Sequence, residues 1–298
     1  MGTLGRVAGG RARVTGMKRW LLAALAAALS AAGVLAAPTN SLDAVVELWR
    51  SGKADQAMEA ANAAIQKEPG NARLLGLRAQ MRVMTGKRAE AETDLSAAIE
   101  AEPDSAWLRQ ERAQLRFRLG RIEDSVADFD KAVEMAPRLL PQNWQRGIAL
   151  YYAGRFTDGR KQFEVHQSVN PEDVENAAWH FLCTAREKGV TNARNMLITV
   201  KRDGRVPMKE IQQLFAGQAT ALDVLNAAAK ADDDGTRRDQ QFYAHLYLGL
   251  YFEATGVLKD RDDHIREAAK LADPDNYMGA VALVHAQRLK LISTPTKP

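Results

Sequence analysis

Small and apolar residues recur along the first half of the chain at helical spacing. When the sequence is divided into units of 34 residues that start at 38, 72, 106 and 140, unit positions 20, 24 and 27 lie four and three residues apart, as on one face of an α-helix. They hold Ala57, Ala61 and Ala64, then Ala91, Leu95 and Ala98, then Ser125, Phe129 and Ala132, then Gly159, Phe163 and His166. Position 8 is also small, with Ala79, Ala113 and Gly147. We expect two helices in each unit that pack closely through these side chains.

Glycine and proline follow the same 34-residue period. The glycines are Gly52, Gly86, Gly120 and Gly154, and the prolines are Pro69, Pro103, Pro137 and Pro171. Glycine tolerates the left-handed backbone angles found where a helix ends, so it suits a tight turn between two helices. Proline has no N–H to donate and restricts the residue before it, so it ends the second helix. Each unit is therefore predicted to be a helix–turn–helix.

A helix–turn–helix repeated every 34 residues resembles the tetratricopeptide repeat (TPR), whose units stack into a solenoid. We expect an all-α TPR solenoid with four units over residues 38–173. Residues 174–241 keep little of the motif and are read as degenerate helical repeats. The pattern returns from Phe242 to Gly256, which predicts a TPR unit and a capping helix over 242–292, before a tail over 293–298.

The degenerate middle still predicts helices. The apolar spacing indicates one from Glu172 to Lys188, a second over Asn192–Val200, one opened by Pro207, and another from about Ala219 to Ala231. Residues 201–206 read as a polar turn and residues 232–235 as a loop. The final helix is expected over residues 276–291.

Arginine stands at unit position 7, where the motif usually has an apolar residue. Arg78 and Arg112 are each followed sixteen residues later by an aspartate, Asp94 and Asp128, whereas Arg146 is followed by Gln162. A charge kept from water needs a partner. We therefore predict partly buried Arg78–Asp94 and Arg112–Asp128 ion pairs; an arginine ladder that reads an anionic ligand is the alternative.

The N-terminus has the pattern of a secretory signal peptide. Met17-Lys-Arg-Trp precedes an apolar, Ala-rich stretch that ends at Ala36-Ala37-Pro38. We read residues 1–37 as this signal, with cleavage after Ala36, residues 1–16 as an upstream extension, and Met17 as the start. An uncleaved anchor is the alternative, although the apolar stretch is short for a membrane span. The protein is expected to be exported, periplasmic or secreted.

The chain's basic charge belongs to this leader. The formal net charge is +4, and the five basic residues before residue 38 leave 36 Lys and Arg of the chain's 41 against 37 Asp and Glu. The remainder is nearly neutral, so nothing in the composition indicates nucleic-acid binding. Those five residues are Arg6, Arg11, Arg13, Lys18 and Arg19.

Chemistry-bearing residues are sparse. Cys183 is the single cysteine, so no intramolecular disulfide can form, and no Leu-x-x-Cys lipidation motif lies near residue 37. His180 and Cys183 could face the same way on one helix, but two ligands make a weak metal site. No nucleophile or phosphate-binding motif is present. We expect no catalysis, no metal and no cofactor. The enzyme alternative would need a deep pocket with convergent titratable groups within residues 174–241.

A TPR solenoid binds mainly through the concave wall lined by its first helices, at unit positions 2, 5, 9, 12 and 13. Aromatic residues and arginine, which anchor many protein interfaces, occur at these positions. Ile148 and Tyr151 also fall there but can instead pack on the next repeat. The predicted groove residues are Arg73, Trp107, Gln110, Gln114, Phe117, Arg118, Trp144 and Tyr152.

Several segments resemble the new-lipoprotein-I family of TPR adaptors from Gram-negative envelopes. They are Gln145–Arg155, Asn170-Pro171, Trp179–Leu182 and Phe242–Gly256. The resemblance implies an all-α, non-catalytic homodimer that scaffolds peptidoglycan hydrolases and an envelope protease. The family's lipobox cysteine is absent here. We therefore interpret the chain as an exported adaptor for a protein partner, with a glycan- or peptidoglycan-binding module as the alternative.

Overall fold

The computed structural model describes residues 40–293, and every regular element within that range is a helix. The predicted all-α class is therefore confirmed. The predicted signal peptide and the last five residues of the tail lie outside the described residues. None of the helices in the described range is long and apolar enough to cross a membrane.

Four consecutive helical hairpins form the first half, as the 34-residue period predicts. Their turns contain Gly52, Gly86, Gly120 and Gly154, with φ of +78°, +80°, +73° and +75°. Glycine reaches this left-handed region without steric cost, so the repeated glycine allows each chain reversal. The hairpins pair α2 (Asn40–Arg50) with α3 (Ala54–Lys67), α4 (Ala72–Met84) with α5 (Arg88–Ala101), α6 (Ala106–Arg118) with α7 (Ile122–Met135), and α8 (Trp144–Tyr152) with α9 (Phe156–His166); the short 3-10 helix η1 (Pro137–Gln142) precedes α8.

The second half contains helices of more variable length, from 6 residues in α11 to 22 in α14. They are α10 (Val174–Lys188), α11 (Val190–Asn195), α12 (Met208–Ala216), α13 (Ala221–Ala228), α14 (Asp234–Thr255), α15 (Leu258–Leu271) and α16 (Tyr277–Arg288). The predicted loop over residues 232–235 is wrong in part, because α14 already begins at Asp234. The Asp233 side chain accepts a hydrogen bond from the Thr236 N–H, which satisfies one of the free donors at that helix start.

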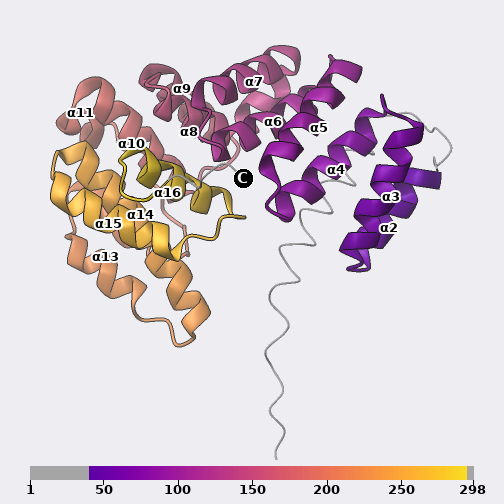
Figure 1. Cartoon of the computed structure of the whole chain (residues 1–298). Coiled ribbons are helices and arrows are strands. Elements are labelled where there is room, and N and C mark those ends of the chain that lie inside the picture. The colour runs from indigo at the N-terminus through magenta and orange to yellow at the C-terminus, as the bar shows by residue number, and fades with distance from the viewer. Residues whose placement is uncertain (1–39, 294–298) are drawn as a thin grey trace, which may run out of the picture.

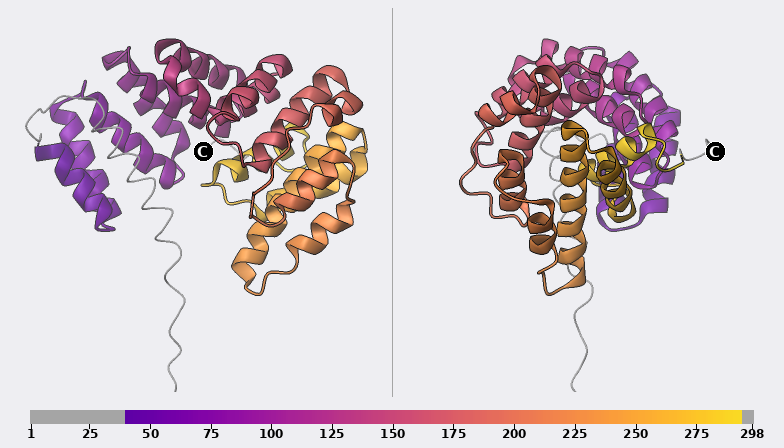
Figure 2. Two further views of the ribbon diagram at one scale, coloured as in Figure 1. Left: turned by 180° about the vertical axis from the view of Figure 1, so that it is seen from behind. Right: turned by 90° about the vertical axis from the view of Figure 1, so that its left-hand side faces the viewer.

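The helices follow an arc whose inner side holds α16, the last described helix. In Figure 1 the hairpins run from α2–α3 through α4–α9 to α10–α11, and the later helices turn back toward the middle. Both views in Figure 2 place α16, in yellow, inside this curve. The last helix therefore contacts the concave wall formed by the first helices of the repeats.

Small residues set the distance between the paired helices. A Cβ atom added at Gly147 would lie 2.6 Å from the Phe163 ring, and one at Gly249 would lie 2.5 Å from Ile265. Both glycines occupy unit position 8 and both large side chains occupy position 24. Position 8 is thus small because the side chain opposite it fills the space between the helices.

The predicted arginine–aspartate pairs are confirmed. Arg78 donates to Asp94 through Nε at 2.9 Å and Nη2 at 2.6 Å. Arg112 donates to Asp128 in the same two-bond arrangement at 2.8 Å for each bond. Both aspartates are buried, and paired hydrogen bonds to the planar guanidinium satisfy them.

Each of these arginines also joins its hairpin to the preceding one. The Nη1 group of Arg78 donates to Asn62 at 2.8 Å, and that of Arg112 donates to Ser96 at 3.1 Å. In the fourth unit Arg146 donates one hydrogen bond to Gln162 at 2.9 Å. It donates another to the carboxylate of Asp130, which belongs to the third unit. Position 7 therefore connects successive units, which explains why it is polar here.

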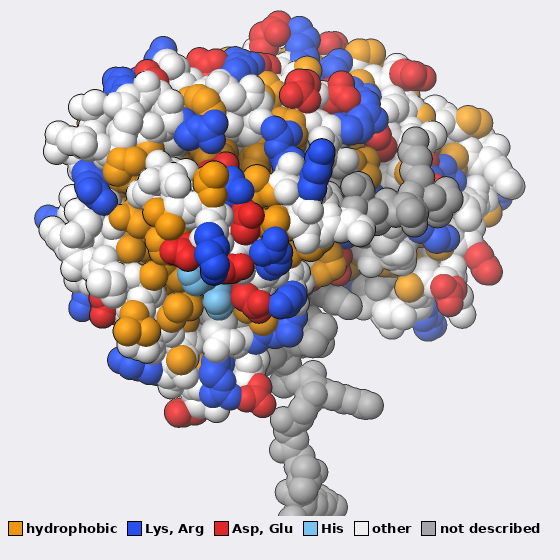
Figure 3. All heavy atoms as spheres, turned by 60° about the vertical axis from the view of Figure 1, so that its left-hand side comes forward, with side chains coloured by type: hydrophobic (Ala, Val, Ile, Leu, Met, Phe, Trp, Pro, Cys, Tyr) orange, Lys and Arg blue, Asp and Glu red, His pale blue; other side chains and the backbone are white. Residues whose placement is uncertain are grey.

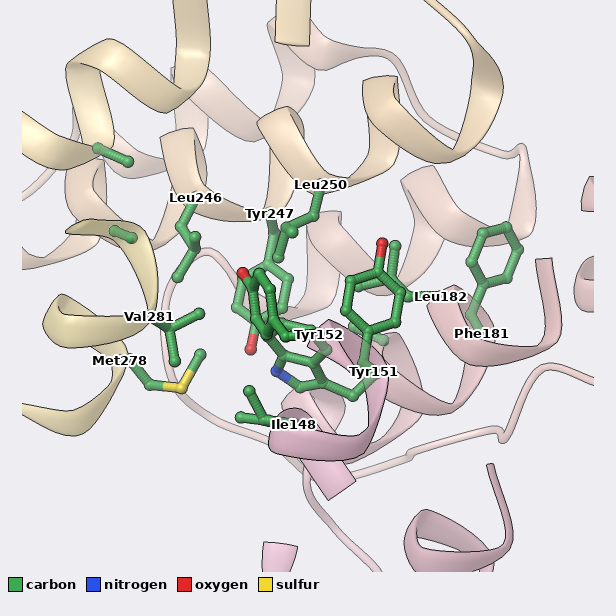
Figure 4. Close-up of a cluster of buried hydrophobic side chains, with 14 of the residues drawn as sticks. Ile148, Tyr151, Tyr152, Phe181, Leu182, Leu246, Tyr247, Leu250, Met278 and Val281 are labelled. Carbon is green, nitrogen blue, oxygen red and sulfur yellow. The ribbon is translucent and has the colours of Figure 1, made fainter. Parts of the chain in front are cut away.

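The core is largest where the two halves meet. Figure 4 shows Tyr151 and Tyr152 of α8 among Leu182, Tyr247 and Val281, which come from α10, α14 and α16. These segments are far apart in sequence but share one apolar cluster. Burial of this cluster fixes α16 against the repeats.

Candidate partner-binding groove

The eight predicted groove residues fall into three places. Arg73, Trp107 and Gln110 line a cavity of about 820 Å³, here called the edge cavity, between the N-terminal ends of α4 and α6 and residues 135–139. Gln114, Arg118 and Trp144 line a second cavity of about 940 Å³, here called the groove cavity. Phe117 and Tyr152 are buried in the core. The concave wall is therefore not one continuous binding surface.

Phe117 and Tyr152 contact the chain's own C-terminal helix. The Phe117 ring stacks on Tyr277 with centroids 5.4 Å apart, and the Tyr152 hydroxyl lies 2.9 Å from His285 Nδ1. Both partners belong to α16. Ile148 and Tyr151 are buried as well, so for these two residues the alternative of core packing is correct. The sequence offers no direct signal for this, because α16 follows the fourth repeat by more than a hundred residues.

The turn before α16 is held on the concave wall by two arginines. Arg118 Nη1 donates to the Pro274 carbonyl at 2.9 Å, and its guanidinium also reaches the Asp275 and Asn276 carbonyls at 3.4 Å each. Arg88 donates to the same Pro274 carbonyl at 3.3 Å. Burial lowers the pKa of Arg118. The arginine predicted to meet a partner thus binds backbone carbonyls of this chain.

The groove cavity lies between the first helices of the repeats and this turn. Its wall comes from α2, α4, α6 and α8, with contributions from α5 and α9, on one side, and from α10, α14 and residues 273–278 on the other. Apolar side chains, including Trp49, Met84 and Trp144, alternate with polar ones. A cavity of this size and mixed lining is typical of a binding site for a small molecule or a short peptide segment.

Unit position 6, which the sequence analysis did not select, supplies cavity residues in three repeats. Leu77, Glu111 and Gln145 all occupy this position and all line the groove cavity. On α6, Glu111, Gln114 and Arg118 are spaced three and four residues apart and therefore share one helix face. The 34-residue register could have indicated these residues, because position 6 recurs on the same face of the first helix of each repeat.

Two partly buried carboxylates line the groove cavity. Burial raises the pKa of Glu111, which accepts a long 3.5 Å hydrogen bond from Gln80. Burial also raises the pKa of Glu175, although Arg205 lies 2.6 Å from it and the Tyr247 hydroxyl donates to it at 2.8 Å. The free-energy cost of keeping a carboxylate from water is therefore offset at Glu175 by Arg205 and Tyr247. At Glu111 the single long bond from Gln80 offsets much less of it.

Cys183 and His180 of α10 lie in the core. Cys183 is buried with Sγ against Gly159, and burial raises the pKa of its thiol. His180 is buried with Nε2 3.4 Å from Glu164. Phe181, Leu182 and Phe215 fill the interior beside them. In residues 40–293 no three His, Cys, Asp or Glu side chains are grouped so that they could hold a metal ion.

Comparison with known proteins identifies the repeats. Residues 48–108 match one family model described as a tetratricopeptide repeat, and residues 108–139 match a second with the same description. No curated protein matches the chain in sequence.

Several solved structures are similar to the chain at low sequence identity. A tetratricopeptide repeat protein from Parabacteroides merdae is 16% identical, covers 82% of this chain and 99% of its own, and superposes with a TM-score of 0.55. MamA is 15% identical and covers 53% of this chain and 86% of its own at a TM-score of 0.49. PilW, described as a type IV pilus biogenesis factor, is 18% identical and covers 76% and 89% at 0.44. The predicted fold, an all-α TPR solenoid, is confirmed by the first of these and by the matched repeats.

Proposed function

We propose that this protein is a non-catalytic adaptor that holds a segment of a protein partner in the groove cavity. TPR solenoids are interaction scaffolds, and their function depends on what their inner wall leaves exposed. The observation that supports the proposal is the groove cavity itself, about 940 Å³ in volume, which remains on the concave wall beside the chain's own α16. Aromatic, methionine and polar side chains on its wall are the residue types found in protein interfaces.

Site-specific photocrosslinking tests this proposal in cells. A benzophenone amino acid in place of Gln114, which lines the groove cavity, should form a covalent adduct with a partner protein. The same substitution at Lys131, exposed on α7, is the matched control. Adducts at both positions or at neither would contradict groove binding. Retention of the purified protein on isolated cell wall without any protein adduct would support the glycan-binding alternative.

We further propose that the adaptor is exported and acts in the cell envelope. The support is the sequence from Met17 to Pro38, with its basic start, apolar middle and small residues before Pro38. A reporter enzyme that is active only after export, fused behind residue 40, should be active in a Gram-negative host. Replacing Leu21 and Leu22 by Arg should abolish that activity. An envelope hydrolase or protease as partner, and a homodimer, are what the family resemblance implies; cross-link identification and sedimentation velocity measure them.

A further inference from the structure

We propose that the groove cavity selects a partner segment that carries a lysine or arginine side chain, with Glu111 as the anchor of that side chain. The inference rests on the proposed function and adds the chemistry of the partner. Four features of the cavity support it: its charge, its unpaired carboxylates, its aromatic wall and its unpartnered polar atoms.

The lining of the cavity is acidic. Five carboxylate side chains line it, whereas Arg118 is the one Lys or Arg side chain among the described residues that do so. Arg118 uses its guanidinium on the carbonyls of Pro274, Asp275 and Asn276. Its charge also interacts with Glu111 and Asp275, but a single cation faces five carboxylates, so the lining stays acidic. The carboxylates belong to Glu111, Asp173, Glu175, Asp273 and Asp275.

Three of these carboxylates have cationic partners within this chain. Arg205 lies 2.6 Å from Asp173 and 2.6 Å from Glu175, and Arg88 lies 3.8 Å from Asp275. Glu111 and Asp273 form no ion pair with any Lys or Arg in the described part of the chain. Glu111 is partly buried, so its unpaired charge is costly and a partner's cation would offset that cost. An acidic segment would instead add repulsion.

The rest of the wall suits an extended chain with a cationic side chain. Trp49 and Trp144 are partly exposed in the cavity, and an indole face attracts a Lys or Arg head group. On the α10 side, Asn176 is 3% and Trp179 is 2% exposed, and both line the cavity. Asn176 Oδ1 and Trp179 Nε1 have no hydrogen-bond partner among the described residues. An acceptor and a donor are thus left for the backbone of a bound segment.

A random dodecapeptide library displayed on phage, selected on the full chain, tests the partner chemistry. We expect selected peptides to be enriched in Lys and Arg and depleted in Asp and Glu. The tightest peptide, made with a fluorescent label, should lose at least about tenfold in affinity when its basic residue is replaced by norleucine, in line with the loss of one charged hydrogen-bonded contact. Raising the salt concentration should weaken it further.

Variants of the protein locate the contact. Glu111→Gln keeps the shape and the hydrogen bond with Gln80 and should weaken binding at least about fivefold, with circular dichroism as the check of folding. Asp273→Asn, on an exposed turn, should weaken peptide binding to a smaller extent. Met84→Arg should abolish binding, because it places in the cavity a charge of the same sign as that of the peptide. Glu100→Gln, exposed on α5, is the matched control and should leave affinity unchanged.

The possible failures are distinguishable. Selected peptides that bind the groove but are acidic or uncharged, and whose affinity is the same for Glu111→Gln, would overturn this inference and leave the proposed function standing. Peptides that bind the Met84→Arg and Glu111→Gln variants as tightly as they bind the original protein must bind at another site. That result would overturn the assignment to this cavity. A library that yields no binding peptide, together with no crosslink from position 114, would overturn both.

Discussion

The Tyr152 hydroxyl and His285 Nδ1 lie 2.9 Å apart in the core and join α8 of the fourth repeat to α16, 133 residues later in the chain. Burial lowers the pKa of His285 and raises that of Tyr152, so the neutral forms of both are favoured and the contact is a hydrogen bond between two neutral groups. This contact and the Phe117–Tyr277 stack close the concave wall over part of its length. Tyr152, which the sequence analysis predicted to contact a partner, thus holds the chain's own helix α16 in place.

Tyr152→Phe should lower the free energy of unfolding by about 1–3 kcal/mol, because it leaves the buried His285 nitrogen without its hydrogen-bond partner. Tyr152→Ala should cost about 3–5 kcal/mol, since a large buried side chain is lost. Urea unfolding followed by circular dichroism measures both. Trp144→Ala is the matched control: Trp144 is only partly buried, against Tyr277, and a smaller loss is expected. Equal losses for Trp144→Ala and Tyr152→Ala would contradict this assignment.

Gly147→Ala should destabilise the fourth repeat by about 1–3 kcal/mol, the usual cost of overpacking. The added Cβ would lie 2.6 Å from the Phe163 ring, which cannot move far inside the core. Adding Phe163→Leu should recover part of the loss, because the second unit already combines Ala79 with Leu95. A double-mutant cycle of unfolding free energies gives the coupling. Additive effects would show that the two side chains do not compete for the same space.

Asp128→Ala should cost about 3–5 kcal/mol, because it leaves two partly buried guanidinium groups without their carboxylate. Asp128 accepts from Arg112 at 2.8 Å and from Arg116 at 2.7 Å, and it is 4% exposed. Asp124→Ala removes an exposed pair with Arg121 on the same helix and should cost less than about 1 kcal/mol. Thermal unfolding of the two variants side by side makes the comparison. A result in which both cost the same would contradict a structural role for the position-7 arginines.

Stability should fall as the pH drops below the ordinary histidine pKa. His245 Nδ1 and His264 Nδ1 lie 2.9 Å apart between α14 and α15, and burial lowers the pKa of both, with His264 further lowering that of His245. Asp260, Asp263 and Glu267 oppose this shift. Figure 3 shows histidine side chains at the surface between basic and acidic groups on this face.

The sign follows from proton linkage. A lowered pKa in the folded state means that the unfolded chain binds more protons below about pH 6.5, so acid favours unfolding. The free energy of unfolding should therefore decrease from pH 7.5 to 5.5. His245→Gln combined with His264→Gln should flatten that dependence. His166→Gln, at a buried histidine on α9 remote from the pair, is the control and should retain the slope; a double variant with an unchanged slope would contradict the role of the pair.

The repeat architecture was predictable because it depends on local chemistry repeated at a fixed interval. Gly86 and Gly120 each permit a left-handed turn between two helices. The sixteen residues from Arg112 to Asp128 place these two side chains on the facing helices of one hairpin. These relationships lie within one unit, so the sequence carries them directly. The beginning of α14 at Asp234 was missed, because a run of aspartates and a glycine reads equally as a loop and as a capped helix start.

The all-α solenoid, its turns and the ion pairs between neighbouring helices follow from the sequence directly, because each depends on residues less than one repeat apart. Which part of the concave wall is free depends instead on how distant segments pack. Residues 273–288 return across the groove and bury Phe117 and Tyr152, while Glu111 and Trp144 remain beside a cavity. That choice depends on the packing of segments more than a hundred residues apart, and no periodic pattern along the chain records it.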